Sequence, residues 1–269
     1  LQTFQLLQRN ERLHMGTPDP YLLTHPLSGS RIEHVRNHKD SSKIPEGQYP
    51  ASFDMLHRRM VAKLYSFLES PERTLQKYPM SDTSVPARMA HAVAYYKMPD
   101  LARSLKEMDS LLKDYPNDPF LHELKGQILF ENGKLSDALT SYRKAAQLLP
   151  GSALILTELA KVELAQQDVS YLPSAIAHLQ KSTSMDGTNS QSWRLLATAY
   201  GKSGNMGMSY LALAEEAMLN DDADAALKQT NQALQTLKEG SPGRLRAQDI
   251  KVRALDMKHK KEGFDISPF

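Results

Sequence analysis

Two histidines have the spacing of a metal clamp. His34 and His38 lie four residues apart, and on a helix this spacing places both imidazoles on one face, where they can bind zinc. The H-E-x-x-H pattern, in which a glutamate between two histidines acts as general base, is missing from the sequence. His122 and Glu123 match only its first half and lie inside a structural repeat. These residues therefore favour a solvated helix face over a catalytic metal site.

Other kinds of catalytic chemistry lack the residues they need. The chain has no cysteine, which excludes disulfides, thiolate ligands and a cysteine nucleophile, and it has no phosphate-binding loop or G-x-S-x-G elbow. Lys and Arg total 33 against 31 Asp and Glu, and a net charge of +2 gives no general attraction to nucleic acid. No stretch approaches the roughly 18 to 20 continuous apolar residues of a membrane span. We therefore expect no transmembrane segment, no nucleic-acid partner and no cofactor in this chain.

The elements that would position a site are helices that recur about every 34 residues. Apolar residues follow a helical period from Ala51 onward, and no segment alternates with a convincing period of two. Residues 117–150 form the most regular copy, with residues typical of tetratricopeptide (TPR) units at fixed offsets: Gly126, Leu129, Gly133, Ala138, Tyr142, Ala145 and Pro150. Small residues such as Gly126 and Ala138 would let two antiparallel helices face each other closely.

Further copies flank this repeat. Residues 85–116 form a weaker first unit, and the next unit, with Ala160 and Ala175, has a turn lengthened by the sequence VSYLP. The W-x2-L-[GA]-x2-Y signature of a TPR first helix then appears as Trp193, Leu196, Ala197 and Tyr200, followed by Gly204. We predict an all-α, TPR-type helical solenoid of about four to five helix pairs, closed by a polar capping helix and preceded by an irregular helical N-terminal segment.

Three segments make up the predicted domain organisation. Residues 1–40 contain an apolar stripe, formed by Phe4, Leu6, Leu7 and Leu13, and a proline-rich stretch. Residues 41–82 are a linker and a connecting helix with one apolar face, formed by Phe53, Leu56, Met60, Leu64 and Leu68. Residues 83–269 are the solenoid. Since Leu1 is neither an initiator Met nor part of a signal peptide, we expect the chain to be cut from a longer protein.

The candidate binding site is the concave face of the solenoid. It is lined by first-helix residues that point away from the packing positions, and the repeats place nine residues there: Met89, Tyr96, Lys97, Phe120, Gln127, Phe130, Lys161, Arg194 and Lys202. Exposed apolar residues beside Lys and Arg suit an extended peptide or a partner helix. Alternatively, the first segments of the chain itself cover these positions.

A motif near the N-terminus carries a family resemblance. The run Leu-x-Thr-His-Pro-Leu-x-x-x-Arg-Ile is formed by Leu23, Thr24, His25, Pro26, Leu27, Arg31 and Ile32. With this motif, the linker, the TPR array and the run SYLALAEEAMLNDDADAALKQTNQAL, essentially the whole chain resembles the C-terminal half of BepA-type periplasmic zinc metallopeptidases, relatives of HtpX. In that family the motif closes the peptidase domain, so the resemblance implies that residues 1–40 are a remnant of that domain.

The resemblance implies a function for the parent protein. It implies a zinc metallopeptidase whose H-E-x-x-H region is absent from this chain, so that the chain alone is inactive and holds no zinc. His25 would lie near the metal only in the intact parent, as a ligand or a neighbouring group. The resemblance also implies a periplasmic location and a protein partner, either an outer-membrane protein or its assembly machinery. The alternative is a stand-alone TPR adaptor with no catalytic domain.

Overall fold

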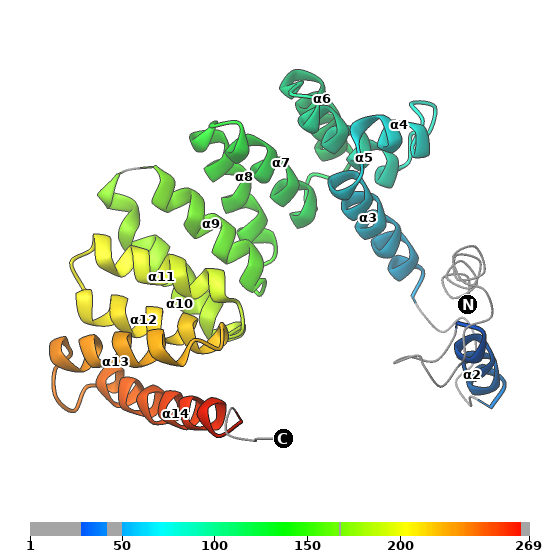
Figure 1. Ribbon diagram of the computed structural model, residues 1–269. Coiled ribbons are helices and arrows are strands. Elements are labelled where there is room, and N and C mark those ends of the chain that lie inside the picture. The colour runs from blue at the N-terminus through cyan, green and yellow to red at the C-terminus, as the bar shows by residue number, and fades with distance from the viewer. Residues whose placement is uncertain (1–27, 42–49, 167, 265–269) are drawn as a thin grey trace. The chain divides into compact units, whose positions relative to one another are not determined.

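The computed structural model describes residues 28–41, 50–166 and 168–264, and in these ranges all regular secondary structure is helical (Figure 1). Thirteen α-helices, α2 to α14, and the short 3-10 turn η2 make up the described part of the chain. The prediction of an all-α fold is confirmed. None of the helices described is long and apolar enough to cross a membrane.

The chain divides into two compact units, with the boundary inside α3 between Leu56 and His57. The first unit contains α2 (Ser28–Ser41), and the second contains most of α3 (Ala51–Leu68), α4 (Pro71–Lys77) and all later helices. This boundary falls inside the segment 41–82 that we predicted to be a linker and connecting helix. The predicted borders at residues 40 and 82 stay predictions, and the stripe of residues 4–13 lies outside the described residues.

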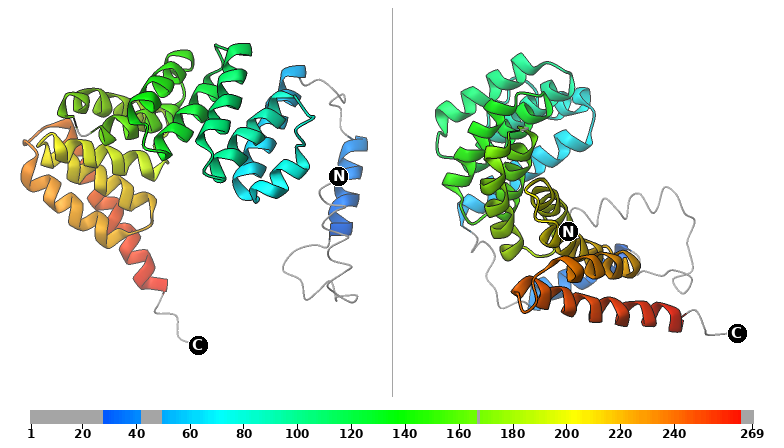
Figure 2. Two further views of the ribbon diagram at one scale, coloured as in Figure 1. Left: turned by 90° about the horizontal axis from the view of Figure 1, so that it is seen from above. Right: turned by 90° about the vertical axis from the view of Figure 1, so that its left-hand side faces the viewer.

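Five helix pairs follow α4 in chain order. They are α5 (Val85–Lys97) with α6 (Leu101–Asp114), α7 (Pro119–Glu131) with α8 (Leu135–Leu148), α9 (Ala153–Ala165) with α10 (Leu172–Met185), α11 (Ser190–Lys202) with α12 (Met206–Leu219), and α13 (Ala223–Thr236) with α14 (Pro242–Phe264). The second helix of each pair also packs on the first helix of the next pair, so the pairs stack in sequence (Figure 1 and Figure 2). This arrangement is the predicted TPR-type solenoid.

The turns inside the pairs follow the predicted residues. Gly133 and Gly204 lie between the helices of two pairs with φ of +72° and +80°, a left-handed conformation that favours glycine. In the third pair the sequence VSYLP lengthens the turn, and its first three residues form η2 (Val169–Tyr171). The insertion therefore changes the turn and leaves the pairing of α9 with α10 intact.

Close packing within the second pair depends on Gly126. A Cβ atom at this position would lie 2.7 Å from the ring of Tyr142 in α8. The Tyr142 ring provides the nearest atoms, and the predicted approach of Gly126 to Ala138 stays a prediction. Both Ala138 and Tyr142 are buried, so the two helices approach each other as the repeat pattern requires.

Candidate functional site

The candidate surface is the side of α5, α7, α9 and α11 that carries the predicted binding positions, which we call the first-helix face. One predicted residue does not belong to it. Met89 of α5 is only 2% exposed and packs in a core with Leu121 of α7. The prediction that Met89 lines an open surface is wrong, because Phe67 of α3 packs against the same cluster.

Helix α3 covers one end of the first-helix face. The Arg59 guanidinium donates two hydrogen bonds to the Asp118 carboxylate, at 2.6 and 2.9 Å, and Lys63 Nζ donates one to Glu123 Oε2 at 2.6 Å. Ala62, between these two anchors, is fully buried. The chain's own α3 therefore occupies the face beside α7. Whether the first segments cover the other predicted positions stays a prediction.

Two predicted binding residues hold α3 and α7 in place. Lys97 Nζ donates to the backbone carbonyl oxygens of Ser66 and Phe67, at 3.2 and 2.9 Å, and thereby caps the last turn of α3. The Tyr96 hydroxyl donates to the Glu131 carboxylate, and this hydrogen bond raises the pKa of Tyr96 to about 12. The Tyr96 ring also lies 6.4 Å from that of Phe67. Both residues therefore have partners within the chain.

The apolar face predicted for α3 is turned to solvent. Its five large side chains, Phe53, Leu56, Met60, Leu64 and Leu68, are 46% to 76% exposed. The face that packs on the solenoid contains charged and small residues together with the Phe67 ring. Burial of an amphipathic helix usually follows the opposite pattern, with the apolar face inside.

The first-helix face is open beyond α3. Phe120, in the first turn of α7, is 45% exposed. The half-buried ring of Phe130 has Lys161 Nζ 5.1 Å from its centroid, within the range of a cation–π interaction, and Lys161 also pairs with Glu158. The Gln127 side chain donates to Glu131 at 3.0 Å. Aromatic rings with charged neighbours thus line this stretch from α7 to α9.

Leu154 belongs to the open stretch and is not among the predicted binding residues. It lies in the first turn of α9 and is 57% exposed. Its signal was present in the sequence, because Leu154 follows Phe120 by one repeat length of 34 residues. Two large apolar side chains therefore occupy the same place in consecutive repeats.

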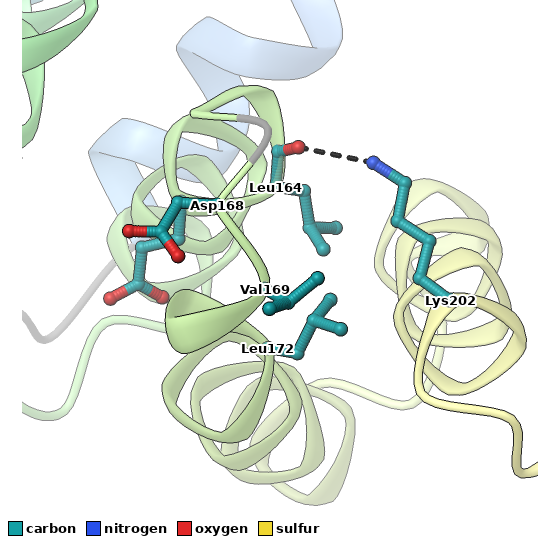
Figure 3. Close-up of a pocket in the computed structure, with 6 residues that line it drawn as sticks. Leu164, Asp168, Val169, Leu172 and Lys202 are labelled. Carbon is teal, nitrogen blue, oxygen red and sulfur yellow. Dashed lines mark hydrogen bonds between the residues drawn. The ribbon is translucent and has the colours of Figure 1, made fainter.

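The predicted residues of α11 lie farther along. Arg194 is exposed and donates to the buried Glu216 of α12 at 2.6 Å. Lys202 Nζ donates to the Leu164 carbonyl oxygen at 3.2 Å, which connects the ends of α11 and α9 (Figure 3). This contact borders a cavity of about 280 Å³ that is also lined by Asp168, Val169 and Leu172.

A larger cavity lies among α10, α11, α12 and α14. It has a volume of about 540 Å³, and its apolar lining includes Trp193, Leu196, Met208 and Leu211. Trp193 Nε1 donates to the Gly187 carbonyl oxygen at 2.9 Å. Trp193 is part of the TPR signature, but the sequence pattern does not indicate this cavity, because its lining comes from four helices.

The histidines do not form a metal cluster in the part of the chain that the structure describes. His34 and His38 are exposed on α2, and no group of three or more His, Asp or Glu side chains among the described residues could hold a metal ion. His25 lies outside the described residues. Its predicted role near zinc in the parent protein stays a prediction.

No protein-family model matches the sequence, and no curated protein matches it. Solved structures of MamA, a TPR-like all-helical protein, do match. The MamA RS-1 ArsTM double mutant is 18% identical, with a TM-score of 0.52 over 62% of this chain and 94% of that chain. The MamA structures from MSR-1 and AMB-1 are 16% and 15% identical, each with a TM-score of 0.50 over 61% of this chain, and are covered to 93% and 98%. This similarity concerns the fold and supports the TPR-type solenoid.

Proposed function

We propose that this chain is a protein-binding scaffold, and that the open first-helix face from α7 to α11 holds a peptide or helix of its partner. The observation that carries the proposal is the repetition of exposed apolar residues at equivalent places, Phe120 and Leu154, on helices that also carry the ring and cation of Phe130 and Lys161. Apolar anchors repeated along a surface, with charged neighbours that set the register, suit recognition of another polypeptide.

The test replaces three residues of this face. A variant with F120A, F130A and R194A should lose its partners in co-purification, because two aromatic anchors and an exposed guanidinium are removed together. Its far-ultraviolet circular dichroism should stay helical. Bound proteins would be identified by mass spectrometry and compared with those of the unchanged chain.

A matched control is available on the second helices. The variant K181A, M185A and V252A also removes one cation and two exposed apolar side chains, from α10 and α14. It should capture the same proteins as the unchanged chain. Equal capture by the first-helix variant and this control would contradict the proposal.

We also propose, from the motif of Leu23 to Ile32, that the parent protein is a periplasmic zinc metallopeptidase acting on outer-membrane proteins or their assembly. An H-E-x-x-H helix encoded upstream of Leu1 would support this proposal, whereas its absence would favour a stand-alone adaptor. Calorimetric titration of this chain with zinc should give no tight stoichiometric site, because a lone imidazole binds zinc weakly. A tight site that disappears in the H25A variant would contradict this expectation.

A further inference from the structure

The end of the first-helix face that α3 occupies is a seat for a charged helix. Its anchoring groups are Asp118, which precedes α7, Glu123 of α7, and the Tyr96 ring of α5. Asp118 and Glu123 are largely shielded from solvent, with side chains 16% and 12% exposed. A helix that covers these carboxylates must therefore bring cations to them, because a buried charge without a partner is costly.

The chain itself supplies the ligand for this seat. Arg59, Lys63 and Phe67 follow one another at intervals of four residues, so they form one stripe along α3. Arg59 meets Asp118, Lys63 meets Glu123, and Phe67 packs near Tyr96. The seat therefore binds a helix that carries the pattern Arg-x-x-x-Lys-x-x-x-Phe.

The contacts that hold α3 are of a kind that a competitor can replace. They are two ion pairs, the hydrogen bonds from Lys97, and the rings of Phe67 and Tyr65 against Tyr96 and Tyr78, while the large apolar side chains Leu56, Met60 and Leu64 remain exposed. A helix that brings equivalent cations to Asp118 and Glu123 restores the same ion pairs, so replacing α3 by such a helix leaves no carboxylate unpaired. Helix α3 has one advantage over a partner helix. It belongs to the same chain as the seat, so its effective concentration at the seat is high.

We infer that α3 occupies part of the partner site while no partner is bound. The partner presents a basic amphipathic helix with Arg and Lys four residues apart, and this helix binds the seat after displacing α3. This inference rests on the proposed function. It adds the chemistry of the partner helix. It also adds a means of controlling partner binding, because the seat is open only when α3 leaves. The exposed stretch from Phe120 to Leu154 continues beyond the seat for the rest of the partner.

The probe is a fluorescein-labelled peptide of residues 51–68 with L56Q, M60Q and L64Q, which keeps the docking stripe and improves solubility. Fluorescence anisotropy would measure its binding to three forms of the full chain. The opened variant, R59A with K63E, loses one anchor and places a carboxylate against Glu123. The reversed variant adds E123K to these changes, so that position 63 is attracted again while the seat repels the lysine of the peptide.

The opened variant should bind the peptide at least about 10-fold more tightly than the unchanged chain, since the attached competitor is weakened. The reversed variant should bind it no better than the unchanged chain. Equal binding to the opened variant and the unchanged chain, or to the opened and reversed variants, overturns the inference. A dimer of the unchanged chain that dissociates in the opened variant would also overturn it, because a second copy's α3 would then be the occupant.

Two further measurements keep the result interpretable. Hydrogen exchange across α5 to α8 should be the same in the opened variant and the unchanged chain. If it is not, K63Q, which removes one anchor without repulsion, replaces the opened variant.

Co-purification with the opened variant separates the two proposals. If capture depends on Phe120, Phe130 and Arg194 but the peptide test fails, the scaffold function stands without this inference. If capture fails while the peptide binds the opened seat, the seat is real and the scaffold function is wrong.

Discussion

Gly126 is a position at which the fold tolerates no side chain. A Cβ atom there would lie 2.7 Å from one Tyr142 ring atom and 2.8 Å from another, and Tyr142 is itself fully packed. The G126A variant should therefore be less stable by about 1 to 3 kcal/mol, because the ring or the helix has to move. Urea unfolding followed by circular dichroism measures this change.

Gly151 provides the control for this substitution. It has no atom within 4 Å of a built Cβ, and its φ is not positive. G151A should change the free energy of unfolding by less than about 0.5 kcal/mol. Similar losses in both variants would show that the Tyr142 contact is not the cause.

Asp118 makes the docking of α3 sensitive to acid. Burial by itself would raise the pKa of Asp118, but the hydrogen bonds and charge of Arg59, together with the amides of Leu121 and Phe120, outweigh burial and lower the pKa. Arg59 is the partner that leaves with α3, so its contribution to the lowered pKa favours docking while Asp118 is ionised, and this contribution is lost as the pH falls through the pKa of Asp118.

Hydrogen exchange of residues 57–68 tests this effect. At neutral pH, R59A should open α3 more easily by about 1 to 3 kcal/mol, since charge-assisted hydrogen bonds are lost. The difference between R59A and the unchanged chain should be constant from pH 6 to about 4 and should shrink as the pH falls further, to about 2.5. In the D118N background it should be small at every pH, and a constant difference across the whole range would contradict the assignment.

Helix α3 shows which features a sequence pattern can and cannot predict. The helical period correctly grouped Phe53, Leu56, Met60, Leu64 and Leu68 on one face, because side chains three or four residues apart share a side of a helix. The pattern does not determine which side is covered. That choice depends on Asp118 and Glu123, about 60 residues away in sequence, and no local signal connects them to α3.

The two faces of α3 should respond differently to substitution. The triple change L56Q, M60Q and L64Q alters only exposed side chains and should leave the exchange protection of residues 57–68 nearly unchanged. A62L enlarges a fully buried side chain and should reduce that protection, since overpacking costs about 1 to 3 kcal/mol. Loss of protection in the triple variant would mean that its exposed face is covered in solution.

For the whole molecule, the repeat pattern predicted the fold better than the binding surface. Small residues at fixed intervals, such as Gly126, Ala160 and Ala197, recur because every pair faces the same packing constraint. The first-helix face lacks such a shared constraint. Met89 is buried in a core against which Phe67 packs, whereas Phe120, at another first-helix position, is exposed. Whether the exposed positions bind a partner stays a prediction.

The stacking of pairs predicts that damage at one end stays local. Ile250 of α14 is fully buried in the last core, with Leu211 and Met218 of α12, so I250A should destabilise that end by about 2 to 5 kcal/mol. Because the pairs contact only their neighbours, hydrogen exchange should accelerate in α12 to α14 and change little in α7 and α8. V252A, which alters an exposed side chain of the same helix, serves as the matched control and should leave both regions unchanged. Equal acceleration in all five pairs would show instead that the solenoid unfolds as a single cooperative unit.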